Sequence, residues 1–87
     1  MNDELNKLRD QIDELDNQIV DLLGERFELV QQVGELKKGS GAQVYQSGRE
    51  YEIIERVVER GVALGLNPLL LQALFLQIFA VSRKSQS

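Results

Sequence analysis

Apolar residues recur in steps of three and four between residues 5 and 36. The series comprises Leu5, Leu8, Ile12, Leu15, Ile19, Leu22, Leu29, Val33 and Leu36. Such steps place every member on one face of an α-helix. No proline interrupts the pattern, and Gly39-Ser40-Gly41 follows it, so we predict one helix over residues 3–38 with Asp3 as its N-cap. The series fails only at position 26, which holds an arginine.

A helix of this length is difficult to cover within one short chain. It would extend about 54 Å at 1.5 Å per residue, whereas a compact monomer of 87 residues has a diameter of roughly 31 Å. A second copy of the chain is the simplest cover for the overhanging apolar face. We therefore predict an intertwined homodimer. The alternative is a hairpin that folds on itself and leaves one helix end frayed.

Two shorter helices are predicted after a glycine-rich loop at residues 39–46. The first of them should start at Ser47 and run to about residue 64. The last should cover residues 67–85, with Asn67 as cap and Pro68 at the first helical position. It is apolar nearly all round, so we expect it to be the most buried element. The pattern predicts a single all-α domain over residues 1–87.

Composition excludes several kinds of chemistry. The chain has no cysteine and no histidine, so disulfides, thiol nucleophiles, imidazole bases and the usual zinc sites are ruled out. A net charge of −4 argues against nucleic acid or an anionic membrane as partner. No apolar run reaches transmembrane length, and the acidic N-terminus does not resemble a signal peptide. We expect a cytoplasmic protein.

Polar residues interrupt the apolar faces of the predicted helices. Arg26 lies in the apolar series, and Lys37 follows 11 residues later, which places it on the same face. Arg49-Glu50 stands where the loop becomes the second helix, and Ser82 and Gln86 continue an apolar stripe of the third. Together these residues predict the wall of a polar pocket inside a helical bundle.

Each of these residues also has a simpler interpretation. Arg26 can be a register device or part of a buried ion pair. Lys37 suits a helix C-terminus, because its charge complements the helix dipole. Arg49 can be solvated, Glu50 can be the capping partner of Ser47, and the last residues can be a fraying end. The coincidence of all of them favours the pocket.

A pocket with arginine and lysine but no histidine or cysteine suits an anion with more than one acidic group. Arginine pairs a carboxylate through two parallel hydrogen bonds. No nucleophile or base suited to neutral pH is present. A reaction in this pocket must therefore depend on positioning and charge stabilisation.

The chain resembles the all-helical (AroQ-class) chorismate mutases over nearly its whole length. The resemblance is carried by Leu8-Arg9-Asp10-Gln11-Ile12-Asp13-Glu14-Leu15-Asp16, Glu25-Arg26, Lys37, Val44, Arg49-Glu50, Leu66-Asn67-Pro68, Leu74-Phe75, Ser82 and Gln86. It implies three helices per chain in an intertwined dimer with two equivalent active sites. It also implies rearrangement of chorismate to prephenate, on the path to phenylalanine and tyrosine, without cofactor or metal.

The resemblance also implies a role for each polar residue. Arg26 and Arg9 would bind the two carboxylates of the substrate. Lys37 and Gln86 would hydrogen-bond the ether oxygen, and Glu50 would hold the ring hydroxyl. The residues that would complete the pocket are Arg49 and Ser82.

Geometry adds a constraint on the two arginines. Arg9 and Arg26 are 17 residues apart on one predicted helix, which corresponds to about 25 Å along its axis and about 100° around it. One small dicarboxylate cannot touch both within one chain, so Arg9 must come from the second subunit.

The chain departs from the family at Gln46, where an aspartate often helps to bind the ring hydroxyl. The amide oxygen of Gln46 can accept that hydrogen bond without a charge.

Two alternative functions remain open at the level of sequence. An isochorismate pyruvate-lyase, or a mutase that acts on aminodeoxychorismate, would use the same scaffold and the same cations. The Arg49-Glu50 pair favours the mutase that acts on chorismate, because a lyase need not keep the Glu50 contact. A helical dimerisation module without an active site is the alternative from another class.

Overall fold

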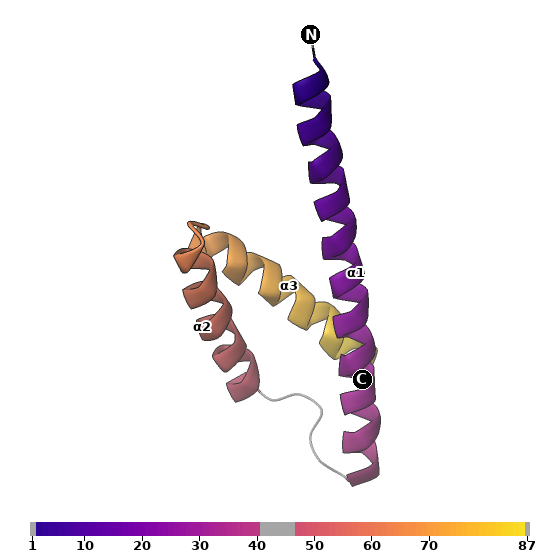
Figure 1. The fold of residues 1–87 in the computed structure, drawn as a ribbon. Coiled ribbons are helices and arrows are strands. Elements are labelled where there is room, and N and C mark those ends of the chain that lie inside the picture. The colour runs from indigo at the N-terminus through magenta and orange to yellow at the C-terminus, as the bar shows by residue number, and fades with distance from the viewer. Residues whose placement is uncertain (1, 41–46, 87) are drawn as a thin grey trace. The chain divides into compact units, whose positions relative to one another are not determined.

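The computed structural model describes residues 2–40 and 47–86, and these form three α-helices and no strand (Figure 1). The helices are α1 (Asp3–Ser40), α2 (Ser47–Ala63) and α3 (Pro68–Gln86). The predicted all-α class, with one very long helix followed by two shorter ones, is confirmed. Two compact units can be distinguished, Met1–Val30 and Gln31–Ser87, and each is described by itself.

Helix α1 runs without interruption for 38 residues and ends at Ser40, two residues beyond the predicted end. At its start, the amide of Asn6 donates a hydrogen bond of 2.8 Å to the carbonyl of Asn2. Asn2, rather than the expected Asp3, therefore holds the N-cap position. Asp3 lies in the first turn and Lys37 in the last, where both charges complement the helix dipole.

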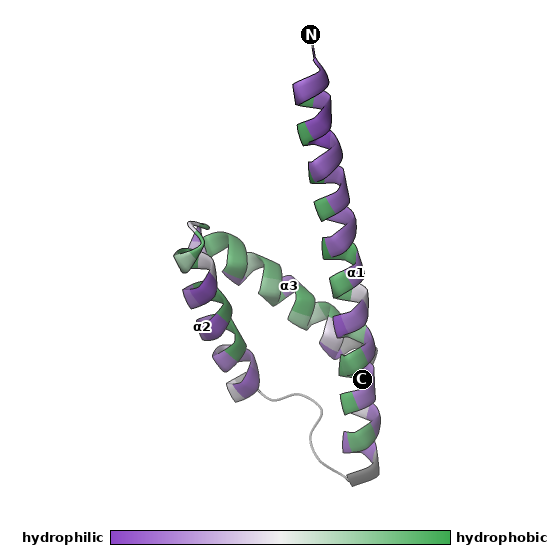
Figure 2. Ribbon diagram, in the orientation of Figure 1, coloured by the Kyte–Doolittle hydropathy of each residue, from purple (hydrophilic) through white to green (hydrophobic). Residues whose placement is uncertain are grey.

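The apolar series of α1 is exposed along its whole length. All nine members keep between 43% and 76% of their surface accessible in the single chain. Figure 2 shows hydrophobic, green segments that recur between the purple, hydrophilic segments of α1. Contiguous apolar surface of this extent marks an interaction site in soluble proteins.

A tight turn ends α2. Gly65 has a φ of 81°, in the left-handed region that glycine adopts without strain. The Gly65 amide donates to the Val62 carbonyl over 3.0 Å, and the Leu66 amide donates to the Gly61 carbonyl over 2.9 Å. These are the two hydrogen bonds of a Schellman C-cap, and they satisfy carbonyls that the end of the helix would otherwise leave without partners.

The start of α3 follows at once. The Oδ1 atom of Asn67 accepts a hydrogen bond of 2.8 Å from the Leu69 amide, and α3 begins at Pro68. Asn67 is thus the N-cap and Pro68 the first helical residue, as the sequence predicts. Two caps back to back leave no room for a longer loop, so α2 and α3 form a helical hairpin.

The hairpin packs through a close approach and a small apolar core. Gly61 lies so near Leu71 that a Cβ atom built on Gly61 would clash with the Leu71 side chain. Ile53 of α2 and Phe79 of α3 are buried. The ring of Phe75 meets that of Phe79 edge to face, with centroids 6.1 Å apart, a favourable geometry for an aromatic pair.

Helix α3, which the sequence predicts to be the most buried element, leaves much of its apolar surface exposed in the single chain. Residues along α3 stay between 42% and 68% exposed, namely Leu69, Leu70, Leu74, Leu76 and Val81. One neighbouring helix covers only one side of a helix that is apolar nearly all round. Apolar composition therefore predicts that α3 needs covering, but it does not say which chain provides the cover.

Candidate active site

The predicted site residues lie at the ends of the helices and along α1. Arg9 and Arg26 belong to α1 within residues 1–30, and Lys37 lies in its last turn. Arg49 and Glu50 are in the first turn of α2. Three further predicted residues lie elsewhere: Ser82 on α3, Gln86 as the last residue of α3 with a side chain outside the described part, and Gln46 outside the described residues altogether.

Burial separates these residues into two groups. Arg26, Lys37 and Glu50 are partly buried and Ser82 is buried, whereas Arg9 and Arg49 are exposed. A cation that is partly withdrawn from water binds a carboxylate more strongly than one in full contact with solvent. In the single chain, the side chains of Arg26 and Lys37 are more withdrawn from water than that of Arg9.

The structure brings Glu50 and the end of α3 together. The Nε atom of Arg83 donates a hydrogen bond of 3.0 Å to the Glu50 Oε2 atom, and its Nη2 atom donates to Oε1. Glu50 and Arg83 are 33 residues apart in the sequence. This bidentate ion pair ties the first turn of α2 to the end of α3, where Ser82 also lies.

Ser82 is buried, with 8% of its surface accessible. Its hydroxyl donates a hydrogen bond of 2.8 Å to the carbonyl of Ile78, one turn earlier in the same helix. A serine that returns its proton to its own helix is tolerated inside an apolar stripe. The hydrogen bond therefore explains how a polar side chain fits at this position, which the sequence marked as anomalous.

Arg49 lies near a different carboxylate, that of Glu52. Its Nη1 atom lies 4.0 Å from the Glu52 Oε2 atom, and the two side chains are 59% and 73% exposed. The simpler interpretation of Arg49, a solvated first-turn residue, describes its position in the single chain. The cation that meets Glu50 is instead Arg83.

Sequence reasoning missed Arg83. The chain end after Ser82 looked like a polar tail, and no local pattern links a residue near 83 to one near 50. A signal was nevertheless present, because a glutamate on the inner side of α2 needs a cation or donors nearby, and Arg83 is a basic residue next to the buried Ser82. Only the hairpin geometry places the two together.

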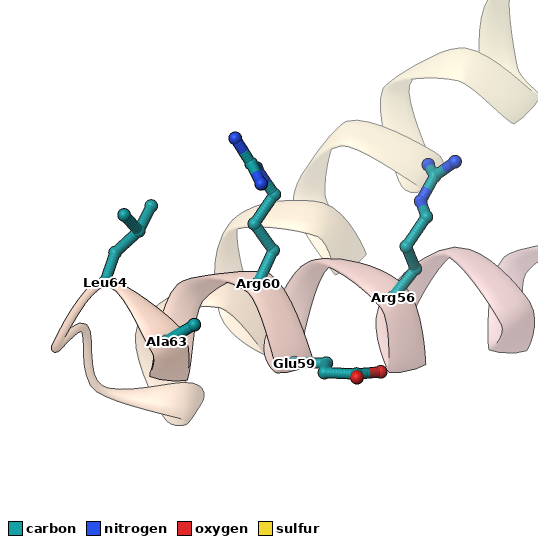
Figure 3. A pocket seen from close by; sticks show the side chains of 5 residues that line it. All are labelled: Arg56, Glu59, Arg60, Ala63 and Leu64. Carbon is teal, nitrogen blue, oxygen red and sulfur yellow. The ribbon is translucent and has the colours of Figure 1, made fainter.

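A shallow depression of about 390 Å³ lies elsewhere, near the C-terminal end of α2 (Figure 3). Its lining residues are Arg56, Glu59, Arg60, Ala63 and Leu64. In Figure 3 the side chains of Arg56 and Arg60 extend to the same side of the helix, while Glu59 extends away from them. None of the predicted site residues lines this depression, and exposed side chains of one helix do not enclose a ligand.

Neither a metal site nor a membrane-spanning helix is found in the part of the chain that the structure describes. No group of three or more carboxylates there is arranged to hold a metal ion. No helix in residues 2–40 or 47–86 is long and apolar enough to cross a membrane.

Comparison with known proteins identifies the family of the chain. The chorismate mutase type II family matches residues 8–87. The chain belongs to this family. The match includes every predicted site residue, from Arg9 to Gln86.

Three individual relatives are also similar to the chain. The chain is 37% identical over 84 residues to the T-protein of Enterobacter agglomerans, a match that covers 97% of this chain and 22% of that protein. It is 38% identical over 56 residues to the bifunctional chorismate mutase/prephenate dehydratase of Aquifex aeolicus, which covers 64% of this chain and 16% of that protein.

A third relative is the T-protein of Haemophilus influenzae, 39% identical over 51 residues, with 59% of this chain and 14% of that protein covered. The chain therefore spans about a fifth or less of the length of these curated relatives.

Proposed function

We propose that this chain is a chorismate mutase, which rearranges chorismate to prephenate. The observation that carries the proposal is the family match over residues 8–87. The residues themselves support it, because two partly buried cations, Arg26 and Lys37, lie in a chain without histidine or cysteine. The substrate is a small dicarboxylate, which such cations suit.

The proposed reaction needs no nucleophile. The rearrangement is a single intramolecular step in which an ether bond breaks while a carbon–carbon bond forms, and negative charge develops on the ether oxygen. Holding the substrate in its reactive conformation and placing a cation at that oxygen both lower the barrier. The second effect acts in the transition state rather than on the bound substrate, so it raises kcat.

Roles follow for individual residues. Arg26 binds one substrate carboxylate, and Arg9 of the second subunit binds the other. Lys37 donates to the ether oxygen, as does Gln86. Glu50 accepts the hydrogen bond of the ring hydroxyl. The residues that complete the site are Gln46, Arg49 and Ser82.

The functional unit that we propose is a homodimer. Fully burying a leucine or isoleucine side chain stabilises by roughly 1.5–3 kcal/mol, and about half of each member of the α1 series is still exposed. The nine residues of each subunit, and so both copies of the series in a dimer, would together contribute on the order of 20 kcal/mol. Association itself costs about 4–15 kcal/mol, so burial of the two series can offset it.

The two proposed carboxylate contacts require the same second copy of the chain. On one uninterrupted α1, Arg9 and Arg26 are about 25 Å apart along the axis. A substrate that contacts Arg26 of one subunit can meet only the partner subunit's Arg9. The dimer thus supplies both the cover for the apolar series and the second carboxylate-binding group.

The decisive experiment incubates the purified chain separately with chorismate and with isochorismate, and identifies the products. We expect prephenate from chorismate. If the chain instead forms salicylate and pyruvate from isochorismate, and no prephenate from chorismate, its activity is that of a lyase and not of a mutase.

A second measurement addresses a chain without an active site. A bicyclic dicarboxylate that mimics the transition state should raise the Tm of the dimer, because it binds the folded state. If the Tm does not rise at a saturating concentration of the analogue, and the chain turns over neither substrate, the dimerisation module without an active site is the better explanation.

A further inference from the structure

Arg83 has a contact that the proposed mechanism does not use. It pairs side-on with Glu50, through Nε to Oε2 at 3.0 Å and through Nη2 to Oε1. The planar guanidinium matches the two carboxylate oxygens, so this arrangement fixes the orientation of the carboxylate as well as attracting it.

The pair matters most for Glu50. The Arg83 side chain is 44% exposed, so solvent screens part of its charge. The Glu50 side chain, in contrast, is only 17% exposed. The carboxylate is therefore the partner that has lost most of its water, and Arg83 replaces part of that solvation.

The paired carboxylate can still bind a substrate. An ionised carboxyl group offers about four acceptor positions, and the two hydrogen bonds from Arg83 occupy two of them. A hydroxyl group can donate to one that remains. Because Arg83 offsets the charge of Glu50, the pair presents an oriented acceptor with little net charge.

Such an acceptor distinguishes between two related ligands. A ring hydroxyl needs only an acceptor, whereas a protonated ring amine gains most from an uncompensated negative charge. Glu50 without a cation beside it would favour the amine. The same carboxylate paired with Arg83 favours the hydroxyl, since the guanidinium repels an ammonium group.

We propose that Arg83 is a positioning residue that sets the specificity of this site: it orients the Glu50 carboxylate and offsets its charge, so that the enzyme selects the ring hydroxyl of chorismate over the ring amine of aminodeoxychorismate. This inference rests on the proposed mutase function. Arg83 acts through Glu50 and need not touch the substrate itself.

The test compares kcat/KM for the two substrates in the full chain and in variants. Arg83→Met removes the cation, so the ratio of chorismate to aminodeoxychorismate turnover should fall by about tenfold or more, the size of one charge-assisted contact. Glu50→Gln leaves the Arg83 cation uncompensated, so the ratio should rise. The opposite directions of the two shifts cannot result from a general loss of structure.

Two further variants complete the design. Arg83→Lys keeps the charge but loses the bidentate geometry, so kcat/KM for chorismate should fall while the ratio stays within about threefold of wild type. Arg83→Gln removes the charge and keeps a long polar side chain. It should reproduce the ratio of Arg83→Met, and it replaces that variant if Arg83→Met does not fold.

The outcomes separate this inference from the proposed function. A wild-type chain that converts neither substrate overturns both. An active wild type whose uncharged Arg83 variants lower kcat/KM equally for both substrates overturns the inference alone, because Arg83 would then be a structural residue only.

Discussion

The α2–α3 hairpin and the part of α1 up to residue 30 use their apolar residues in different ways. The hairpin has specific contacts inside the chain: a Schellman turn at Gly65, an approach of Gly61 to Leu71, and the Arg83–Glu50 pair. The α1 segment is equally regular, yet its apolar series remains exposed. The hairpin therefore buries part of its apolar surface within its own chain. The α1 segment leaves its series exposed, and we propose that a second copy of the chain covers it.

The largest expected effect tests whether the apolar series of α1 is an interface. Leu15→Glu places a charge in the middle of the series, and burying it in a dimer would cost several kcal/mol. We expect the dimer Kd to rise by at least about 100-fold, as measured by sedimentation equilibrium. Activity should fall in parallel, because Arg9 would no longer reach the partner's site.

The matched control for this variant is Asn17→Glu. It introduces the same charged residue two positions further on, about 200° around the helix from Leu15. It should leave the mass of the dimer unchanged. A monomeric wild type, or an unaltered dimer in Leu15→Glu, would show that the exposed series is not the interface.

The next effect concerns the charge carried by the end of α1. Lys37→Ala should lower kcat/KM for chorismate by roughly 10²-fold or more, because we propose that Lys37 is a preorganised donor to the ether oxygen. The neighbouring Lys38 is exposed, so Lys38→Ala is a matched control and should retain nearly full activity. Equal rates in both variants would remove Lys37 from the site.

A smaller effect is expected inside the hairpin. Gly61→Ala forces a Cβ atom into the space of the Leu71 side chain, and overpacking of this kind costs about 1–3 kcal/mol. Gly48 has no heavy atom within 4 Å of an added Cβ, so Gly48→Ala should leave stability unchanged or raise it by up to about 1 kcal/mol. Urea unfolding of the two variants measures the difference, and equal midpoints would contradict the close approach.

The smallest effect separates the two ion pairs of the hairpin. Arg49 and Glu52 are both exposed and 4.0 Å apart, so a double-mutant cycle to alanine should give a coupling below about 0.5 kcal/mol. The same measurement on Arg83 and Glu50 should give a larger value, because their contact is bidentate and Glu50 is mostly buried. A coupling above about 1 kcal/mol for the exposed pair would refute this ranking.

Local signals predicted most of the fold. Asn67 and Pro68 specify a helix start through capping chemistry that involves only neighbouring residues, and the structure shows the expected hydrogen bond to Leu69. The apolar series, with its steps of three and four residues, predicted an uninterrupted α1, because this signal also involves only residues that are close in the sequence. At the N-terminus of α1, the N-cap is Asn2 rather than the predicted Asp3, because adjacent polar residues suit the position almost equally well.

Contacts between distant residues could not be predicted in this way. The pairing of Arg83 with Glu50 depends on the hairpin bringing together two residues that are 33 apart. The roles of Arg26, Lys37 and Gln86 came from the resemblance to a family and stay predictions. The exposure of α3 was missed because a stretch of leucines shows that burial is needed, and the single chain does not provide all of it.

Helix α1 also limits how the gene for this chain can change. Arg9 and Arg26 share one unbroken helical register, and inserting or deleting a single residue between them would swing one about 100° around the axis relative to the other. Substitutions at the solvent-facing positions of that segment leave the register intact. If Arg9 and Arg26 have the roles that we propose, substitution of solvent-facing residues between them is therefore open to this protein, whereas an insertion or a deletion of one codon is not.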